Sequence, residues 1–174
     1  RAVSFNKRNR RRSTRAEPAN GSRELLADAI RTNPTAETCN ELGITLLESR
    51  RFEAAPNAFD RAIEINAAFA PAYVNRGAAQ LDLERFEAAL QSFEHALLLD
   101  PESAEIHIHR GNALSALGRH ESALESYDRA IALKPEFAEA YYNRGDALHE
   151  LNRPEGALES FAQAMRLKPD FEFL

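Results

Sequence analysis

The sequence predicts an all-α solenoid, in which four helix–turn–helix units stack behind a partial amino-terminal unit. Glycine recurs every 34 residues, and two series of alanine and one series of aromatic residues recur with the same period. Each unit has two segments with an apolar face at helical spacing, and no unit can enclose that face alone, so the units must pack on one another. The recurring residues are Gly43, Gly77, Gly111 and Gly145; Ala55, Ala89, Ala123 and Ala157; Ala62, Ala96, Ala130 and Ala164; and Phe59, Phe93, Tyr127 and Phe161.

The composition sets limits on the class of protein. Of 174 residues, 44% are hydrophobic and 28% are charged, which argues against wholesale disorder. No apolar run approaches the roughly 18 residues of a membrane span, so we expect no membrane association. Cys39 is the only cysteine, which excludes an internal disulfide and a four-cysteine zinc site and fits a reducing compartment. We therefore expect a cytoplasmic protein.

The charge is divided unevenly along the chain. Residues 1–23 have a net charge of +7, whereas residues 24–174 have a net charge of −12. Residues 1–22 cannot build a core, so we expect a basic, flexible leader, and we expect nucleic acid to bind only through it. Its candidate functions are contact with nucleic acid or another anionic surface, a localisation signal, and an intramolecular ligand. The alternative is a solubilising leader or leftover linker.

The body divides into units of equal length. The full units are predicted at 36–69, 70–103, 104–137 and 138–171. Residues 23–35 align with the second helix of a unit and are predicted to cap the amino end as half a repeat. Residues 172–174 begin a further unit that is cut short. Because no polar capping helix follows, either the last helix is left exposed or the protein continues, and we favour continuation.

The third unit illustrates how each unit is built. One helix is predicted over 104–117, Gly118 and Arg119 break it, and a second helix is predicted over 121–134. An acid opens each second helix, where the helix dipole favours negative charge, and proline closes three of the units. Glycine and alanine let the helices approach closely, while the aromatic residue fills the space between them. The acids are Glu53, Glu87, Glu121 and Glu155, and the prolines are Pro101, Pro135 and Pro169.

This pattern resembles the tetratricopeptide repeat over residues 36–171. The matching residues are the series given above, with Tyr73 and Tyr141 at a bulky aromatic place near the start of the unit. Cys39 and His107 occupy that place in the first and third units, which departs from the family pattern. The resemblance implies a right-handed superhelix whose first helices line a concave groove, and this groove usually binds an extended peptide or another protein.

The resemblance also implies which residues face the groove, six from each first helix. These places hold eight acids and neither lysine nor arginine, so we expect a basic or polar protein or peptide partner. The proposed peptide-groove residues are Asn40, Glu41, Asn75, Asp82, His109, Asn112, Tyr142, Asn143, Asp146 and Glu150. The other groove places hold Glu37, Ile44, Leu47, Glu48, Pro71, Val74, Ala78, Leu81, Glu105, Ile108, Ser115, Ala116, Glu139 and His149.

Asn75 and Asn143 are candidates to bind a peptide backbone, because an amide both donates and accepts hydrogen bonds. Similar asparagines line the repeat region of the O-linked N-acetylglucosamine transferases. His109 and Glu41 interrupt the series here, so half of such a ladder remains, and the alternative is that these are solvated polar side chains. The family branch that binds acidic chaperone tails uses groove cations, which this sequence lacks, so we expect no binding of such tails.

Arginine recurs at the same period, next to the signature glycine. We predict a ladder of arginine–carboxylate pairs between neighbouring units, with a structural role rather than a role in ligand binding. The arginines are Arg76, Arg110 and Arg144, with Leu42 at this place in the first unit, and the acids on the preceding second helices are Asp60, Glu94 and Asp128.

The sequence offers no catalytic constellation. His107 and His109 are two residues apart, which places them on nearly opposite sides of a helix, whereas metal-binding pairs prefer a spacing of four. There is no phosphate loop, nucleophile elbow or carboxylate pair that stands out from the acidic surface. We therefore expect no enzyme activity, cofactor or metal site in these residues.

These observations predict a protein-interaction module that binds an extended, basic or polar segment in an acidic groove. Two alternatives stay open. Segments 142–148 and 167–174 resemble bacterial repeat proteins that continue into a glycosyltransferase domain, in which the groove would recruit the acceptor protein. The uncapped ends and the basic leader would also allow the chain to act as a self-associating scaffold.

Overall fold

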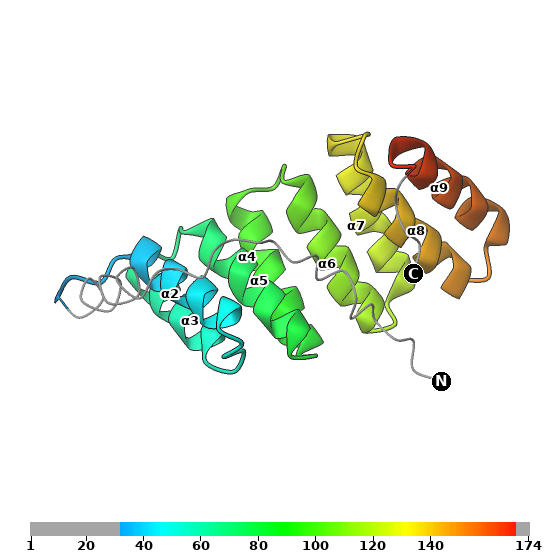
Figure 1. The fold of residues 1–174 in the computed structure, drawn as a ribbon. Coiled ribbons are helices and arrows are strands. Elements are labelled where there is room, and N and C mark those ends of the chain that lie inside the picture. Colours follow the sequence, from blue (N-terminus) through cyan, green and yellow to red (C-terminus); the bar gives the residue numbers. More distant parts are fainter. Residues whose placement is uncertain (1–31, 170–174) are drawn as a thin grey trace.

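A computed structural model of the chain describes residues 32–169, which form a row of helix pairs (Figure 1). This part of the chain contains eight helices and no strand. The helices are α2 (Ala36–Glu48), α3 (Ala55–Ile65), α4 (Ala70–Asp82), α5 (Phe86–Leu99), α6 (Ala104–Ala116), α7 (His120–Leu133), α8 (Ala138–Glu150) and α9 (Pro154–Leu167). The leader predicted at 1–22, most of the half-repeat predicted at 23–35 and the continuation predicted at 172–174 lie outside the described residues.

The row of helices is a solenoid that curves toward its first helices. Each helix packs against the next one along the chain. The first helices α2, α4, α6 and α8 also contact one another in sequence, whereas the second helices within residues 32–169 do not. Because the first helices are closer together than the second helices, they lie on the concave side. The predicted α-solenoid is confirmed.

The signature glycines lie against the aromatic ring of their own unit. A methyl carbon added to Gly77 would lie 2.6 Å from a ring carbon of Phe93, far inside van der Waals contact. Ala89 and Ala96 of the same unit are fully buried. The other glycine–aromatic contacts are Gly43 with Phe59, Gly111 with Tyr127 and Gly145 with Phe161. The small residues therefore allow the close approach of the two helices that the sequence predicts.

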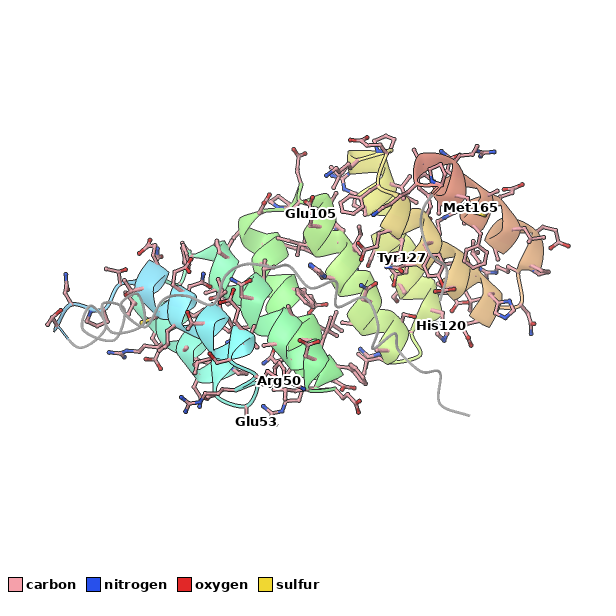
Figure 2. All side chains as sticks on the ribbon, viewed as in Figure 1. Arg50, Glu53, Glu105, His120, Tyr127 and Met165 are labelled. Carbon is pink, nitrogen blue, oxygen red and sulfur yellow. The ribbon has the colours of Figure 1, made fainter. Side chains whose placement is uncertain are left out.

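The turn inside each unit contains one residue with a left-handed backbone. The φ angles are 61° at Arg50, 57° at Glu84, 72° at Gly118 and 57° at Asn152. These four residues share the 34-residue period, and Figure 2 shows Arg50 in the turn between α2 and α3. Three of them are not glycine, so each carries a backbone that costs an L-residue roughly 1–2 kcal/mol.

The second helix of the first unit begins later than the corresponding helices of the other units. The acids of those units lie in the first turn of α5, α7 and α9, as predicted. Glu53, however, precedes α3, which begins at Ala55, so the prediction that Glu53 opens a helix is wrong. Pro56 gives the reason, because a proline ring clashes with the carbonyl four residues earlier and is tolerated in a first turn. Glu53 instead pairs with Arg85 at 2.7 Å.

The predicted arginine–carboxylate ladder is confirmed. The nitrogen–oxygen distances are 2.7 Å for Arg76 and Asp60, 3.9 Å for Arg110 and Glu94, and 2.6 Å for Arg144 and Asp128. Each pair joins the first helix of one unit to the second helix of the preceding unit. The ladder therefore fixes how neighbouring units sit on one another.

Each ladder arginine also donates to a buried serine, which the sequence did not lead us to predict. The distances are 3.0 Å from Arg76 to Ser92, 2.6 Å from Arg110 to Ser126 and 2.7 Å from Arg144 to Ser160. These serines lie on the second helix of the same unit, so one guanidinium joins three helices. The first unit has Leu42 and Ala58 at the two places, so it lacks both members of this hydrogen bond.

The outer side of α9 is apolar and uncovered in the described part of the chain. Leu158 is 69% exposed and Met165, which is labelled in Figure 2, is 51% exposed. By contrast, Leu90 and Leu124, at the place equivalent to Leu158, are 7% and 9% exposed. The two equivalent leucines are buried because another unit packs on α5 and on α7. No helix among residues 32–169 is both long enough and apolar enough to cross a membrane.

Candidate peptide-binding groove

The concave face of α2, α4, α6 and α8, which we call the groove, carries the residues predicted for partner binding. Glu41, Asp82, Asp146 and Glu150 are exposed. Five further predicted residues are partly exposed: Asn75, His109, Asn112, Tyr142 and Asn143. Asn40 is the exception, because its side chain is only 6% exposed.

Pairs of asparagines connect neighbouring first helices. The Nδ2 atom of Asn75 donates to Oδ1 of Asn40 at 2.9 Å, and Nδ2 of Asn143 donates to Oδ1 of Asn112 at 2.9 Å. The hydroxyl of Tyr127 also donates to Oδ1 of Asn112 at 2.9 Å. Asn40 and Asn112 thus hold the groove together, while Asn75 and Asn143 each retain one N–H group and the amide oxygen for another partner.

Asp146 is a groove carboxylate with a strongly raised pKa. Its side chain is exposed, but it lies in the hollow of the solenoid, where the surrounding protein replaces part of the solvent. Burial therefore raises the pKa of Asp146 to about 6, the nearby Glu150 raises the pKa further, and His149 opposes the change. Burial also raises the pKa of Glu139, with Lys168 opposing it.

The cations near the groove come from the loops that follow the second helices. Lys134 follows α7 and lies 3.2 Å from Glu105, so this acid is paired. The ammonium group of Lys134 also lies 4.6 Å from the centre of the Phe137 ring. The groove places themselves contain neither lysine nor arginine, so the exposed acids nearer its middle face no positive side chain from the first helices.

Two aromatic contacts shape the carboxyl-terminal half of the groove. The ring of His109 stacks on Phe93 at 5.4 Å between centroids, and burial lowers the pKa of His109 while Glu105 opposes the change. The ring of Tyr142 lies 5.5 Å from that of Phe161, and burial raises the pKa of Tyr142. His109 is therefore a neutral, stacked side chain at neutral pH and adds no cation to the groove.

The amino-terminal half of the groove contains a strip of aliphatic residues, which the predicted acidic character of the groove did not take into account. The strip, which we call the apolar strip, consists of five partly exposed residues: Ile44, Leu47, Val74, Ala78 and Leu81. They extend from the second turn to the last turn of α2 and α4, with Glu37 in the first turn of α2 and with Glu48 and Asp82 as the last residues of the two helices. The corresponding places on α6 and α8 are mostly polar. The middle of the groove therefore changes from apolar to polar along the solenoid.

His107, which departs from the family pattern, has a structural role. Its Nε2 atom lies 3.0 Å from the carbonyl oxygen of Pro101. The hydroxyl of Tyr73 donates to the equivalent carbonyl, that of Ala67, at 3.2 Å. The histidine thus makes the hydrogen bond that tyrosine makes in the second unit. Within residues 32–169 no group of three or more His, Cys, Asp or Glu is arranged to hold a metal ion.

Comparison with known families identifies the repeats. Tetratricopeptide repeat profiles match residues 36–69, 70–103 and 138–171, and a TPR repeat profile matches residues 111–152. The chain belongs to the tetratricopeptide repeat family. These repeats make it a protein-interaction or scaffold module. No curated protein matches the sequence.

Solved structures with the same fold include proteins named MamA. One MamA structure superimposes with a TM-score of 0.80 and 23% identity, over 86% of this chain and 88% of that one. MamA from Desulfovibrio magneticus RS-1 gives a TM-score of 0.79 and 22% identity, over 86% of this chain and 85% of that one. At this level of identity the likeness concerns the fold of the tetratricopeptide solenoid.

Proposed function

We propose that this tetratricopeptide repeat protein binds an extended, basic or polar protein segment in its groove. The observation that supports the proposal is the charge of the concave face, which has eight acids and neither lysine nor arginine at the groove places. Such a surface attracts cationic segments and repels acidic ones, so it provides selectivity as well as a higher association rate.

The groove residues suggest how a segment would be held. The side-chain amides of Asn75 and Asn143 each have a free N–H group and an oxygen that suit the backbone of an extended chain. Lysine or arginine of the segment would pair with Asp146 and Glu150, and this would offset the cost of holding the Asp146 carboxylate in the hollow. The aliphatic residues of α2 and α4 would cover apolar side chains of the same segment.

Peptide arrays test this proposal directly. Twelve-residue peptides of basic, neutral and acidic composition should bind in that order of affinity, and basic peptides should dissociate as salt is added. The variant Asp146→Asn/Glu150→Gln should weaken binding of basic peptides. The matched control is Glu125→Gln/Glu159→Gln, which removes two exposed acids from the second helices α7 and α9. Equal binding by both variants would refute the proposal.

Acidic chaperone tails provide a second test of selectivity. A peptide that ends in several acidic residues should show no saturable binding, because the groove places contain neither lysine nor arginine to clamp its carboxylates. A saturable titration by calorimetry would contradict the charge argument. Recruitment of an acceptor protein by a larger glycosyltransferase would use the same groove. Self-association would use the uncapped chain ends and the basic leader. Both stay predictions.

A further inference from the structure

The groove offers two chemically different surfaces in a fixed order. The apolar strip leaves five aliphatic side chains partly in solvent on α2 and α4. On α6 and α8 the equivalent places include Asn112, Asp146 and His149, so a segment that lies along the groove passes from an apolar to a polar, acidic surface. Acids flank both halves, so charge alone would not fix the position of a ligand, but the apolar strip would.

Residues 2–12 of this chain have the same order of chemistry. Val3 and Phe5 are apolar, and residues 7–12 then contain five basic residues. No acid occurs among residues 1–12. A segment of this composition has nothing in its own sequence to neutralise its charge, and it complements the groove in both charge and hydrophobicity.

We propose that residues 1–12 of the chain occupy its own groove, with Val3 and Phe5 on the apolar strip and residues 7–12 beside the acids of α6 and α8. This inference rests on the proposed function, because it uses the same groove. The leader then competes with any partner segment. A partner binds when its affinity exceeds that of the tethered leader or when another anionic surface removes the leader.

The lengths of the segments permit this arrangement. Contacting helices lie about 8–10 Å apart, so the three steps from α2 to α8 span about 30 Å. Ten extended residues cover about 33 Å, which matches the distance along the groove. Residues 13–22 lie between this segment and the half-repeat predicted at 23–35, and these ten residues extend to about 33 Å, enough to return from the α8 end.

The test uses the full chain and a labelled peptide with the sequence of residues 1–12. In a leader-neutral chain, serine replaces Lys7, Arg8, Arg10, Arg11 and Arg12. Fluorescence anisotropy should show saturable binding of the peptide to the leader-neutral chain. Binding to the wild-type chain should be on the order of tenfold weaker or more, because a tethered leader has an effective concentration near the millimolar range. This difference should persist on dilution of the protein.

Groove variants then locate the peptide. In the leader-neutral chain, Asp146→Asn/Glu150→Gln should weaken peptide binding several-fold, whereas Glu125→Gln/Glu159→Gln should leave it unchanged. A peptide with Val3→Ser and Phe5→Ser should also bind more weakly, and a chain with Ala78→Lys in the apolar strip should lose affinity for the original peptide. Circular dichroism of each variant checks that the helices are intact.

Three results would overturn the inference. Equal peptide affinity for the wild-type and leader-neutral chains would mean that the leader leaves the groove open. A competition that disappears on dilution would assign the groove to the leader of a second copy rather than to the same chain. If an unrelated basic peptide binds the groove and the leader peptide does not, this inference fails while the proposed function stands; if neither binds, both fail.

Discussion

The arginine that joins three helices makes a measurable prediction about how the units are held together. Arg144 donates to Ser160, which is 1% exposed, over 2.7 Å, and pairs with Asp128 over 2.6 Å. A hydrogen bond to a charged group contributes about 1.5–3 kcal/mol, and an exposed ion pair contributes about 0–1 kcal/mol. Arg144→Leu should therefore lower the free energy of unfolding by about 2–3 kcal/mol. Ser160→Ala should lower it by about 1–2 kcal/mol, because the guanidinium loses an acceptor.

The first unit shows how the two losses should combine. Leu42 and Ala58 occupy the same two places there, so the repeat accommodates two apolar residues at these places. The double variant Arg144→Leu/Ser160→Ala should therefore cost no more than Arg144→Leu alone, a coupling of about 1–2 kcal/mol. Urea unfolding followed by circular dichroism and by tyrosine fluorescence measures all four free energies. Costs that add to within about 0.3 kcal/mol would refute a shared contact.

Three further predictions concern the turns, the end of the solenoid and the groove. Glu84→Gly should raise the free energy of unfolding by about 1 kcal/mol and Gly118→Ala should lower it by about as much, since both residues have φ near 60–70°. Urea unfolding checks both values. A lower free energy of unfolding for Glu84→Gly would contradict the turn geometry. Leu124→Ala should lower the free energy of unfolding by about 2–4 kcal/mol and Leu158→Ala by less than about 0.5 kcal/mol, because another unit covers Leu124 only. Equal shifts in melting temperature would show that Leu158 is buried. The pKa of Asp146 is raised from 3.8 to about 6, so the folded state holds this proton more tightly than the unfolded state, and stability should fall as pH rises from about 4 to 6. Asp146→Asn should remove that part of the pH dependence. An unchanged profile of stability against pH in this variant would contradict the raised pKa.

The periodic residues allowed most of the fold to be predicted. The places of Gly77, Phe93 and Ala96 hold a glycine, an aromatic residue and an alanine in every unit. The contacts between such residues lie inside a unit or between adjacent units. The arginine ladder could be predicted for the same reason, since both partners recur at the 34-residue period. An interaction can therefore be predicted from the sequence when both of its partners recur at the period of the repeat.

Interactions of single side chains were harder to predict. Ser92, Ser126 and Ser160 recur at the same period, so the signal was present, but a serine on a helix carries no mark of burial. His107 looked like a departure from the pattern, although an imidazole nitrogen reaches the same carbonyl as a tyrosine hydroxyl. The delayed start of α3 follows from one proline, whose effect on its helix outweighed the repeat.

The groove was predicted in outline and changed in detail. Its acids could be predicted, because the residues at the groove places can be read from the sequence once these places are assigned to the first helices. The pairing of Asn75 with Asn40 depends on how closely two first helices approach, which the sequence of either helix does not specify. The raised pKa of Asp146 likewise depends on how far the folded chain buries its carboxyl group, which the sequence of α8 alone does not specify.

Backbone amide shifts measured during a titration show whether the concave face of α2, α4, α6 and α8 is the binding surface. A basic twelve-residue peptide added to the isotope-labelled chain should shift amides of these four helices, with the largest changes around Asn75 and Asp146. The outward faces of α5, α7 and α9 should change little. Shifts concentrated on those outward faces, or on the uncovered side of α9 at Leu158, would show that the peptide binds outside the groove.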